Sequence, residues 1–334
     1  MGIKKPFEIS LEVNDSCNYS CEFCFGKNSV DKRIDLSREQ AKKVIEKIAA
    51  EGIERIRFTG GEPLLWPHLQ EIISFAKQQG LFTSLNTNGS LFSKESAKEL
   101  APVLDDVLVS FHALNDKSEQ QLCGQKGLFD KKISAIKDLA NQGVFVRAST
   151  ILSGQNISAL EEFNKTLENL PVSQWVLLRP IPNSNDLNPI SCTKIAEAVE
   201  KLVAINKNRK NDEFHLIENA LPFCCANPEN VSKVALGGIR EDGHSSLFIN
   251  SSLEIKPSYF LNRELGSALE TPIKEAWESP FMQKMHALEF IAEQCHDCKY
   301  VMQCMAGSRF SALRVNKSLY ALDPLASSEK FIRQ

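Results

Sequence analysis

Three closely spaced cysteines are the residues best suited to chemistry in this sequence. Cys17, Cys21 and Cys24 are separated by three and two residues and follow an alternating, strand-like segment at 7–13. Three thiolates on one loop can bind one cluster, and they are one fewer than the four that normally hold a [4Fe–4S] cluster. The spacing therefore indicates a cluster with an open iron. A zinc site with a distant fourth ligand, buried structural thiols and a disulfide with one spare thiol are the alternatives.

A glycine pair follows the next strand-like segment, at 53–58. The run Gly60-Gly61-Glu62-Pro63 places two residues without side chains at the end of a strand. There the backbone can pass close to a ligand. The same four residues also fit an ordinary turn between a strand and a helix.

Together these two motifs resemble the radical S-adenosylmethionine (SAM) superfamily, in which CxxxCxxC carries an aromatic residue, here Phe23, before the third cysteine. The resemblance spans roughly residues 7–180. It implies that the three cysteines hold a [4Fe–4S] cluster whose open iron chelates SAM, and that Glu62 accepts a hydrogen bond from the SAM ammonium. Reduction of the cluster would cleave SAM to methionine and a 5′-deoxyadenosyl radical, which abstracts a hydrogen atom from the substrate.

Further positions resemble those that contact SAM in the superfamily. Two of these positions also have a purely structural interpretation. Asn88 could belong to an ordinary Asn-Gly turn, and Ser110 could be a strand hydroxyl with its own hydrogen-bond partner. His112 could also face the site, although a lone histidine is more often structural. The predicted SAM-binding residues are Gly60, Gly61, Glu62, Pro63, Asn88, Ser110, Arg147 and Thr150.

The segments that must position these residues alternate between strands and helices. Strand-like segments at 7–13, 53–58, 82–85, 107–111, 144–150 and 175–178 alternate with helix-like segments at 37–50, 68–79, 94–100, 131–141 and 158–170. The alternation predicts a parallel sheet of right-handed βαβ units, with ligands at the carboxyl ends of the strands. Six strands are too few for a complete eight-stranded barrel. The predicted fold class is α/β, a partial (β/α)6 TIM-like barrel.

A second cysteine group lies near the C-terminus. Cys295, Cys298 and Cys304 form the pattern CxxCx5C. The pattern resembles the SPASM extension of radical SAM enzymes, which binds auxiliary iron–sulfur clusters. A zinc site formed by these cysteines and His296 is the main alternative.

This C-terminal pattern lacks cysteines that the SPASM family usually has. Ser258 and Ser308 stand at two of those positions, and Ala326 stands at a third. In the family's division of ligands, the two serine positions belong to one auxiliary cluster and the three cysteines that are present belong to the other. The resemblance therefore implies one auxiliary [4Fe–4S] cluster instead of two.

The sequence does not identify the fourth ligand of that cluster. Asp323, Cys224 or Cys225 could supply it, or the iron could be unligated by protein. In some peptide-modifying members of the superfamily a thiol donates a hydrogen atom to a substrate radical, so Cys224 and Cys225 are also candidate hydrogen donors. Inert buried thiols are a third interpretation. Cys123 and Cys192 have no partner at metal-ligand spacing and are interpreted as ordinary thiols.

The chain divides into three predicted regions. They are a radical SAM core at 1–180, a linker and helical region at 181–235, and a SPASM-like domain with an iron–sulfur cluster at 236–334. The boundary at 180 rests on a polar, proline-bounded segment that follows it. In the third region, segments 247–249 and 253–255 predict a hairpin, and 273–288 predicts a helix.

The leading functional hypothesis is a radical SAM oxidoreductase that abstracts hydrogen from a C–H bond and thereby modifies a ribosomally synthesised peptide. One alternative is a radical SAM enzyme acting on a small molecule in cofactor or antibiotic biosynthesis. A non-catalytic zinc or iron–sulfur binding protein is the other. The expected partners are the substrate and a reductant such as flavodoxin or ferredoxin. Because no module precedes the first strand, recognition of a leader peptide would require a separate leader-peptide-binding protein or the C-terminal half of this chain.

Composition and charge exclude several other classes. The 334 residues include 39 Lys and Arg against 42 Asp and Glu, a net charge of −3, which argues against nucleic-acid binding through global charge. The sequence has neither a signal peptide nor the run of about 18 apolar residues that a membrane helix needs. These features predict a cytoplasmic protein without a membrane partner. In that compartment, clustered cysteines bind metal more often than they form disulfides.

Overall fold

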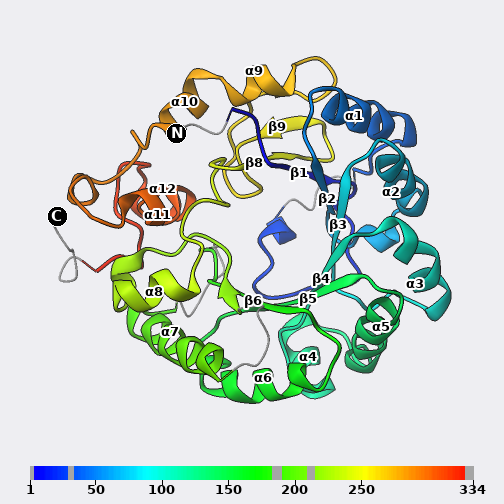
Figure 1. Cartoon of the computed structure of the whole chain (residues 1–334), viewed down its shortest axis with the longest axis horizontal. Helices are drawn as coiled ribbons and strands as arrows, with labels where there is room; N and C mark the ends of the chain where they lie inside the picture. The colour runs from blue at the N-terminus through cyan, green and yellow to red at the C-terminus, as the bar shows by residue number, and fades with distance from the viewer. Residues whose placement is uncertain (1–3, 29–33, 183–189, 209–214, 328–334) are drawn as a thin grey trace.

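Six parallel strands form the core of the computed structural model, which describes residues 4–28, 34–182, 190–208 and 215–327. Each strand pairs in parallel with the next one along the chain, so the sheet curves into a partial barrel, as predicted (Figure 1). The strands are β1 (Glu8–Glu12), β2 (Arg55–Thr59), β3 (Phe82–Thr87), β4 (Asp106–Ser110), β5 (Phe145–Ile151) and β6 (Gln174–Leu178).

The helices between these strands cover the outside of the barrel (Figure 1). They are α1 (Arg38–Ala50), α2 (Leu69–Gln78), α3 (Lys94–Leu100), α4 (Asp116–Cys123), α5 (Phe129–Asn141) and α6 (Leu160–Glu168). A capping box begins α1, because Ser37 Oγ accepts from the N–H of Gln40 and the Gln40 side chain accepts from the N–H of Ser37. Helix α4 was not predicted from the sequence, because its residues are mostly polar and carry little apolar periodicity.

The C-terminal half extends the same sheet at both edges. At one edge, β7 (Leu216–Ile217) pairs with β6, and at the other edge β8 (Ser246–Ile249) pairs in parallel with β1. The strand β9 (Glu254–Lys256) then forms the predicted hairpin with β8, and β10 (Gly266–Ser267) completes the sheet. The first and third predicted regions therefore contribute strands to the same sheet. The boundaries between the regions, after residues 180 and 235, stay predictions.

The remaining helices complete the ring. They are α7 (Cys192–Lys207), α8 (Pro228–Val234), α9 (Ile273–Trp277), α10 (Pro280–His286), α11 (Val301–Cys304) and α12 (Arg309–Asn316). In Figure 1, α11 and α12 lie between α8 and α10, on the side of the ring opposite β2 and β3. The predicted helix at 273–288 is two helices, because Pro280 cannot donate a backbone hydrogen bond and instead begins α10.

Short 3-10 turns link these elements. They are η1 (Phe25–Asn28), η2 (Pro63–Leu65), η3 (Ala101–Val103), η4 (Ile157–Ala159), η5 (Phe223–Cys225) and η6 (Glu293–Cys295). Among the described residues, no helix has both the length and the apolar composition that crossing a bilayer requires. Residues 183–189, which contain most of the predicted polar linker, lie outside the described residues.

Candidate functional site

The loop that carries the first three cysteines leaves β1 and is fastened to the end of β2. Two backbone hydrogen bonds hold it there. The N–H of Gly61 donates to the carbonyl of Asn14 at 3.0 Å, and the N–H of Glu62 donates to the carbonyl of Ser16 at 2.7 Å. The cysteine loop (residues 14–24) therefore lies over the carboxyl ends of the strands, where the sequence analysis expected a ligand site.

The far side of the cysteine loop is fastened to α4. The N–H of Ser20 donates to the carbonyl of Cys123 at 3.0 Å, and the N–H of Glu22 donates to the carbonyl of Leu122 at 3.2 Å. Cys123, interpreted from the sequence as incidental, thus takes part in positioning the loop through its backbone. No sequence signal pointed to this contact, because α4 itself was not predicted.

The two glycines of the GGEP motif are required by the cysteine loop itself. A Cβ on Gly60 would lie 2.3 Å from Asn14 Oδ1, and a Cβ on Gly61 would lie 2.3 Å from the carbonyl oxygen of Ser16. Neither contact is sterically possible. From the sequence, these glycines were predicted to let the backbone approach a ligand. In the structure they lie instead against the backbone and the Asn14 side chain of the loop.

Glu62 joins the ends of β2 and β3. Its carboxylate is fully buried and accepts hydrogen bonds from Thr87 Oγ1 at 2.8 Å and from the backbone N–H groups of Asn88 at 2.7 Å and Leu64 at 3.1 Å. Burial raises its pKa, although these three donors act in the opposite direction. The structure therefore gives Glu62 a positioning role and does not bring its carboxylate to the surface. Pro63, also buried, begins η2.

Asn88 ties the end of β3 to the cysteine loop. Its Nδ2 donates to Asn18 Oδ1 at 2.8 Å, and its Oδ1 accepts from Ser90 Oγ at 2.6 Å. Asn18 closes the ring by donating to Ser90 Oγ at 2.9 Å. The structure thus brings the predicted residue Asn88 to the cysteine loop through Asn18.

Burial and nearby negative charge favour the protonated form of two thiols of the loop, Cys17 and Cys21. Desolvation, with the neighbouring Cys24 and Cys123, raises the pKa of Cys21 to about 12. Burial also raises the pKa of Cys17. A metal cluster must displace these protons, so cluster binding is coupled to proton release.

The loop can accommodate a cluster with a bound ligand. Cys17 and Cys24 are exposed and Cys21 is partly exposed, so three thiols are accessible on one loop. Beside them, Asp15 Oδ1 is buried and has no hydrogen-bond partner among the described residues. A bound polar ligand can satisfy such an acceptor.

His112 lies against the cysteine loop. Its ring meets the ring of Phe23 edge to face, with 4.9 Å between the ring centroids. Its Nδ1 accepts a hydrogen bond from the N–H of Ile151 at 3.2 Å, so the ring proton belongs on Nε2. Burial, with a smaller effect from Lys132, lowers the pKa of His112 to about 3. The imidazole is therefore neutral.

Two predicted SAM-binding residues on β4 and β5 face different sides of the sheet. Ser110, the last residue of β4, is in register with Ser149. Thr150 donates to the carbonyl of Phe111 at 2.6 Å and accepts from Trp175 Nε1 at 2.8 Å. Trp175 stacks on Phe163 of α6, so Thr150, which is hydrogen-bonded to Trp175, faces the outer helices. The alternation of a strand then turns Ser149 to the barrel interior, and the structure does not bring Thr150 to the cysteine loop.

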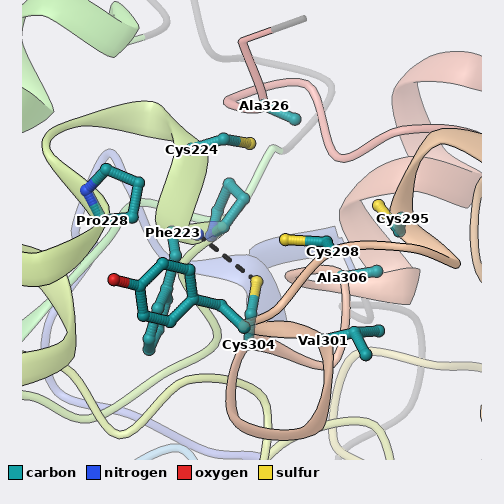
Figure 2. Close-up of a pocket in the computed structure, with 11 residues that line it drawn as sticks. Phe223, Cys224, Pro228, Cys295, Cys298, Val301, Cys304, Ala306 and Ala326 are labelled. Carbon is teal, nitrogen blue, oxygen red and sulfur yellow. Dashed lines mark hydrogen bonds between the residues drawn. The ribbon is translucent and has the colours of Figure 1, made fainter. Parts of the chain in front are cut away.

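A pocket near the C-terminus gathers four cysteines (Figure 2). The space between its walls, with the adjoining open solvent included, is about 410 Å³, and the walls include the three predicted auxiliary ligands and Cys224. Burial raises the pKa of Cys224 to about 11 and that of Cys304 to about 12. The methyl group of Ala326 also lines this pocket.

Asp323, a predicted fourth ligand, has other partners. Its Oδ2 lies 2.6 Å from Arg179 Nη1 and accepts from the N–H of Ser308 at 2.8 Å. Its Oδ1 accepts from the N–H of Leu325 at 2.8 Å. Asp323 is 1% exposed and is not among the residues that line the pocket. Cys225, the other candidate, is fully buried in the hydrophobic core.

The two serines that replace cysteines of the SPASM pattern have local roles. Ser258 and Ser308 each accept a hydrogen bond from the backbone N–H three residues further along, and Ser308 thereby caps α12. Close to them in sequence, Phe260 and Phe310 pack with 5.7 Å between their ring centroids, and both contact Phe25. Through Phe25, which directly follows the cysteine loop, aromatic packing therefore connects the loop to the segments that carry Ser258 and Ser308.

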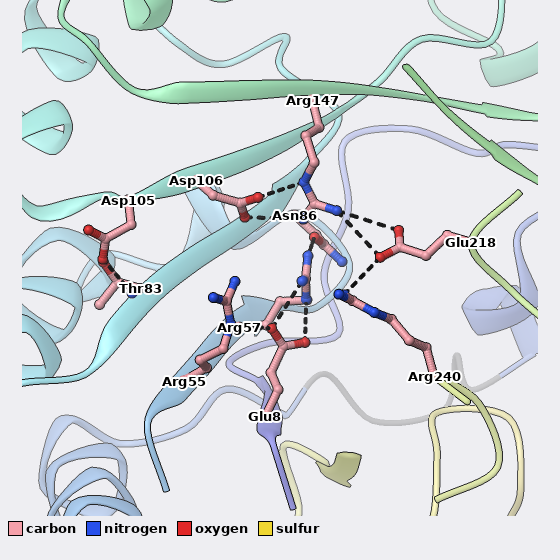
Figure 3. A network of polar contacts seen from close by, with 10 residues as sticks. All are labelled: Glu8, Arg55, Arg57, Thr83, Asn86, Asp105, Asp106, Arg147, Glu218 and Arg240. Carbon is pink, nitrogen blue, oxygen red and sulfur yellow. Dashed lines mark hydrogen bonds and ion pairs between the residues drawn. The ribbon is translucent and has the colours of Figure 1, made fainter. Parts of the chain in front are cut away.

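Arg147, the last predicted SAM-binding residue, lies in a network of ion pairs near the amino ends of the strands (Figure 3). Its guanidinium binds Asp106, the first residue of β4, at 2.5 Å and Glu218 at 3.4 Å. In the same network, Arg57 binds Glu8, the first residue of β1, at 2.8 Å. Since the cysteine loop follows the carboxyl end of β1, the structure does not bring Arg147 to it.

Neither cysteine group is arranged around a single point. Among the described residues, no three His, Cys, Asp or Glu side chains are grouped to hold one metal ion. A [4Fe–4S] cluster binds each thiolate through a different iron, so its ligands need not converge on one point.

Comparison with known proteins places this geometry in a family. Residues 11–167, which run from β1 into α6, match the model of the Radical SAM superfamily. The chain contains a radical SAM domain. A [4Fe–4S] cluster and SAM are therefore its cofactors, and the radical SAM domain contains both the cysteine loop and the GGEP motif.

Relatives of this radical SAM chain include enzymes with different named roles. The AdoMet-dependent heme synthase of Nitratidesulfovibrio vulgaris is 24% identical over 96% of this chain and 91% of its own length. The antilisterial bacteriocin subtilosin biosynthesis protein AlbA of Bacillus subtilis is 24% identical over 93% of this chain and 69% of its own length.

Solved structures of proteins with bound S-adenosylmethionine share the fold. Streptococcus suis SuiB bound to S-adenosylmethionine matches with a TM-score of 0.80 at 17% identity, over 98% of this chain and 78% of that chain. The structure of anSMEcpe with bound AdoMet matches with a TM-score of 0.77 at 16% identity, over 95% of this chain and 93% of that chain.

Proposed function

We propose that this radical SAM enzyme abstracts a hydrogen atom from a C–H bond of a ribosomally synthesised peptide during its maturation. The observation that carries the proposed chemistry is the cysteine loop, which Gly61, Glu62 and Asn88 hold over the carboxyl ends of the strands. This position is at the mouth of the barrel, so a substrate above the strands lies next to the loop.

Cys17, Cys21 and Cys24 would hold the [4Fe–4S] cluster. When bound, the cluster and SAM supply a 5′-deoxyadenosyl radical after one-electron reduction, with methionine as the other product. The chain's own residues position the loop and shield it. Glu62 fixes the strand ends, and the neutral imidazole of His112 packs on Phe23 without adding charge beside the thiols.

A peptide substrate is supported by a relative and by a solved structure that shares the fold. AlbA, a bacteriocin biosynthesis protein, matches 93% of this chain. SuiB has also been solved with its precursor peptide SuiA, in a structure that shares this fold with a TM-score of 0.79.

The second candidate function is modification of a porphyrin-type small molecule. The match to AdoMet-dependent heme synthase favours it, because that match spans 96% of this chain and 91% of the relative.

One auxiliary [4Fe–4S] cluster completes the proposed cofactors, with Cys295, Cys298 and Cys304 among its ligands. Ser258 and Ser308 accept backbone hydrogen bonds, which supports a single auxiliary cluster. The proposed electron donor is a flavodoxin or ferredoxin. The proposed leader-binding partner is a separate protein, and the proposed location is the cytoplasm.

The test is anaerobic turnover with a candidate precursor peptide encoded beside the gene. Reconstituted protein is incubated with SAM, dithionite and the peptide, and parallel reactions contain an iron porphyrin instead. The proposal expects 5′-deoxyadenosine together with a mass change in the peptide. A mass change in the porphyrin alone would support the second candidate. A fully loaded protein that forms no 5′-deoxyadenosine would overturn both and leave the binding-protein hypothesis.

A further inference from the structure

The C-terminal pocket brings together cysteines from two distant segments. Cys224 belongs to η5, whereas Cys295, Cys298 and Cys304 lie between η6 and the end of α11. Figure 2 shows Cys224 entering the pocket from one side and the other three cysteines entering from the other. Four thiols around one pocket are the number that a fully ligated [4Fe–4S] cluster requires.

Hydrogen bonds to sulfur hold the two segments together. The backbone N–H of Phe223, which precedes Cys224, donates to Cys304 Sγ at 3.3 Å. The same thiol lies 3.9 Å from the carbonyl of Leu221. An N–H donor to a cysteine sulfur also stabilises that sulfur as a cluster ligand and adjusts the cluster's potential. The position of η5 is thus fixed relative to Cys304 before any cluster binds.

The competing fourth ligands are held elsewhere. The carboxylate of Asp323 is paired with Arg179 and accepts two backbone N–H groups. Cys225 is fully buried in the core, and its carbonyl accepts from the thiol of Cys192 at 2.7 Å. The wall of the pocket also contains Ala326, which stands where the SPASM pattern usually has a cysteine.

We infer that Cys224 is the fourth ligand of the auxiliary cluster, and that it replaces the ligand lost at Ala326. The inference rests on the auxiliary cluster proposed above but not on the substrate. With four thiolates bound, no iron of this cluster is open, so the cluster cannot bind substrate directly. Cys224 is then a ligand and does not donate a hydrogen atom to the substrate.

The test isolates the auxiliary cluster in a variant that carries Cys17→Ala, Cys21→Ala and Cys24→Ala. This background loses SAM cleavage but keeps about four irons per chain if the auxiliary cluster forms. Failure here leaves the proposed SAM chemistry of the unmodified chain untouched, so the two proposals fail separately. Iron content and the low-temperature electron paramagnetic resonance spectrum of the reduced protein are the readouts.

Three further variants are compared in that background. We expect Cys224→Ala to lose iron or to change the spectrum, and Cys225→Ala, the matched control, to leave both unchanged. Adding Ala326→Cys to Cys224→Ala should restore about four irons, because it returns a thiol to the same pocket wall. Unchanged iron and spectrum in Cys224→Ala, or loss in Cys225→Ala but not in Cys224→Ala, would overturn the inference.

A second measurement needs no substitution at the pocket. In the iron-loaded background variant, alkylation followed by peptide mapping should leave Cys224, Cys295, Cys298 and Cys304 unmodified. All four should react after the iron is removed with a chelator. Alkylation of Cys224 while the other three stay protected would overturn the inference.

Discussion

The carboxylate of Glu62 accepts a hydrogen bond from the backbone N–H of Asn88 at 2.7 Å, and this contact joins the ends of β2 and β3 under the cysteine loop. Asn88 in turn binds Asn18 within that loop. The GGEP carboxylate therefore acts on the cofactor site through the backbone that it organises. Substitutions in this set should affect folding and cofactor loading together.

Glu62→Ala should destabilise the protein and weaken cluster loading. Loss of the carboxylate leaves the Thr87 hydroxyl and the N–H groups of Asn88 and Leu64 without their acceptor. A buried donor without a partner costs about 1–3 kcal/mol, so we expect a loss of at least about 2 kcal/mol in the free energy of unfolding. Urea unfolding and iron analysis measure both effects. Glu99→Ala, an exposed position on α3, is the control, and equal results for the two variants would contradict the assigned role.

Gly61→Ala should displace the cysteine loop. The new Cβ would lie 2.3 Å from the carbonyl oxygen of Ser16, so the backbone of the loop or of the strand end must move. We expect severalfold weaker SAM binding and incomplete iron loading at the first cluster. Gly154→Ala is the matched control because its Cβ would meet nothing within 4 Å. Normal SAM binding by Gly61→Ala would show that the loop tolerates the displacement.

His112 should make the cluster-free protein sensitive to acid. Burial lowers its pKa from 6.5 to about 3, so between these values the unfolded chain binds a proton that the folded chain does not. Stability is then lost as the pH falls from about 6.5 toward 3, by up to about 1.4 kcal/mol per pH unit for one proton. His112→Gln should flatten the slope of unfolding free energy against pH. The exposed His296, changed to Gln, is the control, and identical slopes in both variants would refute the assignment.

The local motifs could be predicted from the sequence because their signals are local. Strand and helix patterns gave the six parallel strands, and the spacing of Cys17, Cys21 and Cys24 identified the loop. Thr150 shows what such local patterns do not predict. Successive side chains of a strand point to opposite faces of the sheet, and it is the neighbouring Ser149 that faces the barrel interior. Arg147 shares that interior, yet it is held by Asp106 at the other end of the strands.

The placement of Cys224 could not be predicted for a different reason. Adjacent cysteines give no signal about which thiol faces a pocket, because that depends on how η5 meets the segment around Cys304. The choice between Cys224, Cys225 and Asp323 therefore required the tertiary arrangement. The same arrangement explains why a carboxylate near the end of the chain is bound to Arg179, directly after β6.

Asp323→Asn separates a structural role of this carboxylate from a ligand role. The substitution keeps oxygen and nitrogen atoms in place but removes the charge that pairs with Arg179, and both side chains are buried. Breaking a buried ion pair by neutralising one partner costs about 3–5 kcal/mol, because the other charge is left uncompensated. We expect a loss of that size in the free energy of unfolding, while the auxiliary site keeps about four irons.

The double variant Arg179→Met with Asp323→Asn should recover part of the lost stability, because it removes the uncompensated guanidinium. Urea unfolding and iron analysis of the single and double variants measure the two quantities independently. Stability near that of the unmodified protein, combined with loss of auxiliary iron in Asp323→Asn, would instead identify Asp323 as a ligand. In that case Cys224 would have to be assigned another function in the pocket.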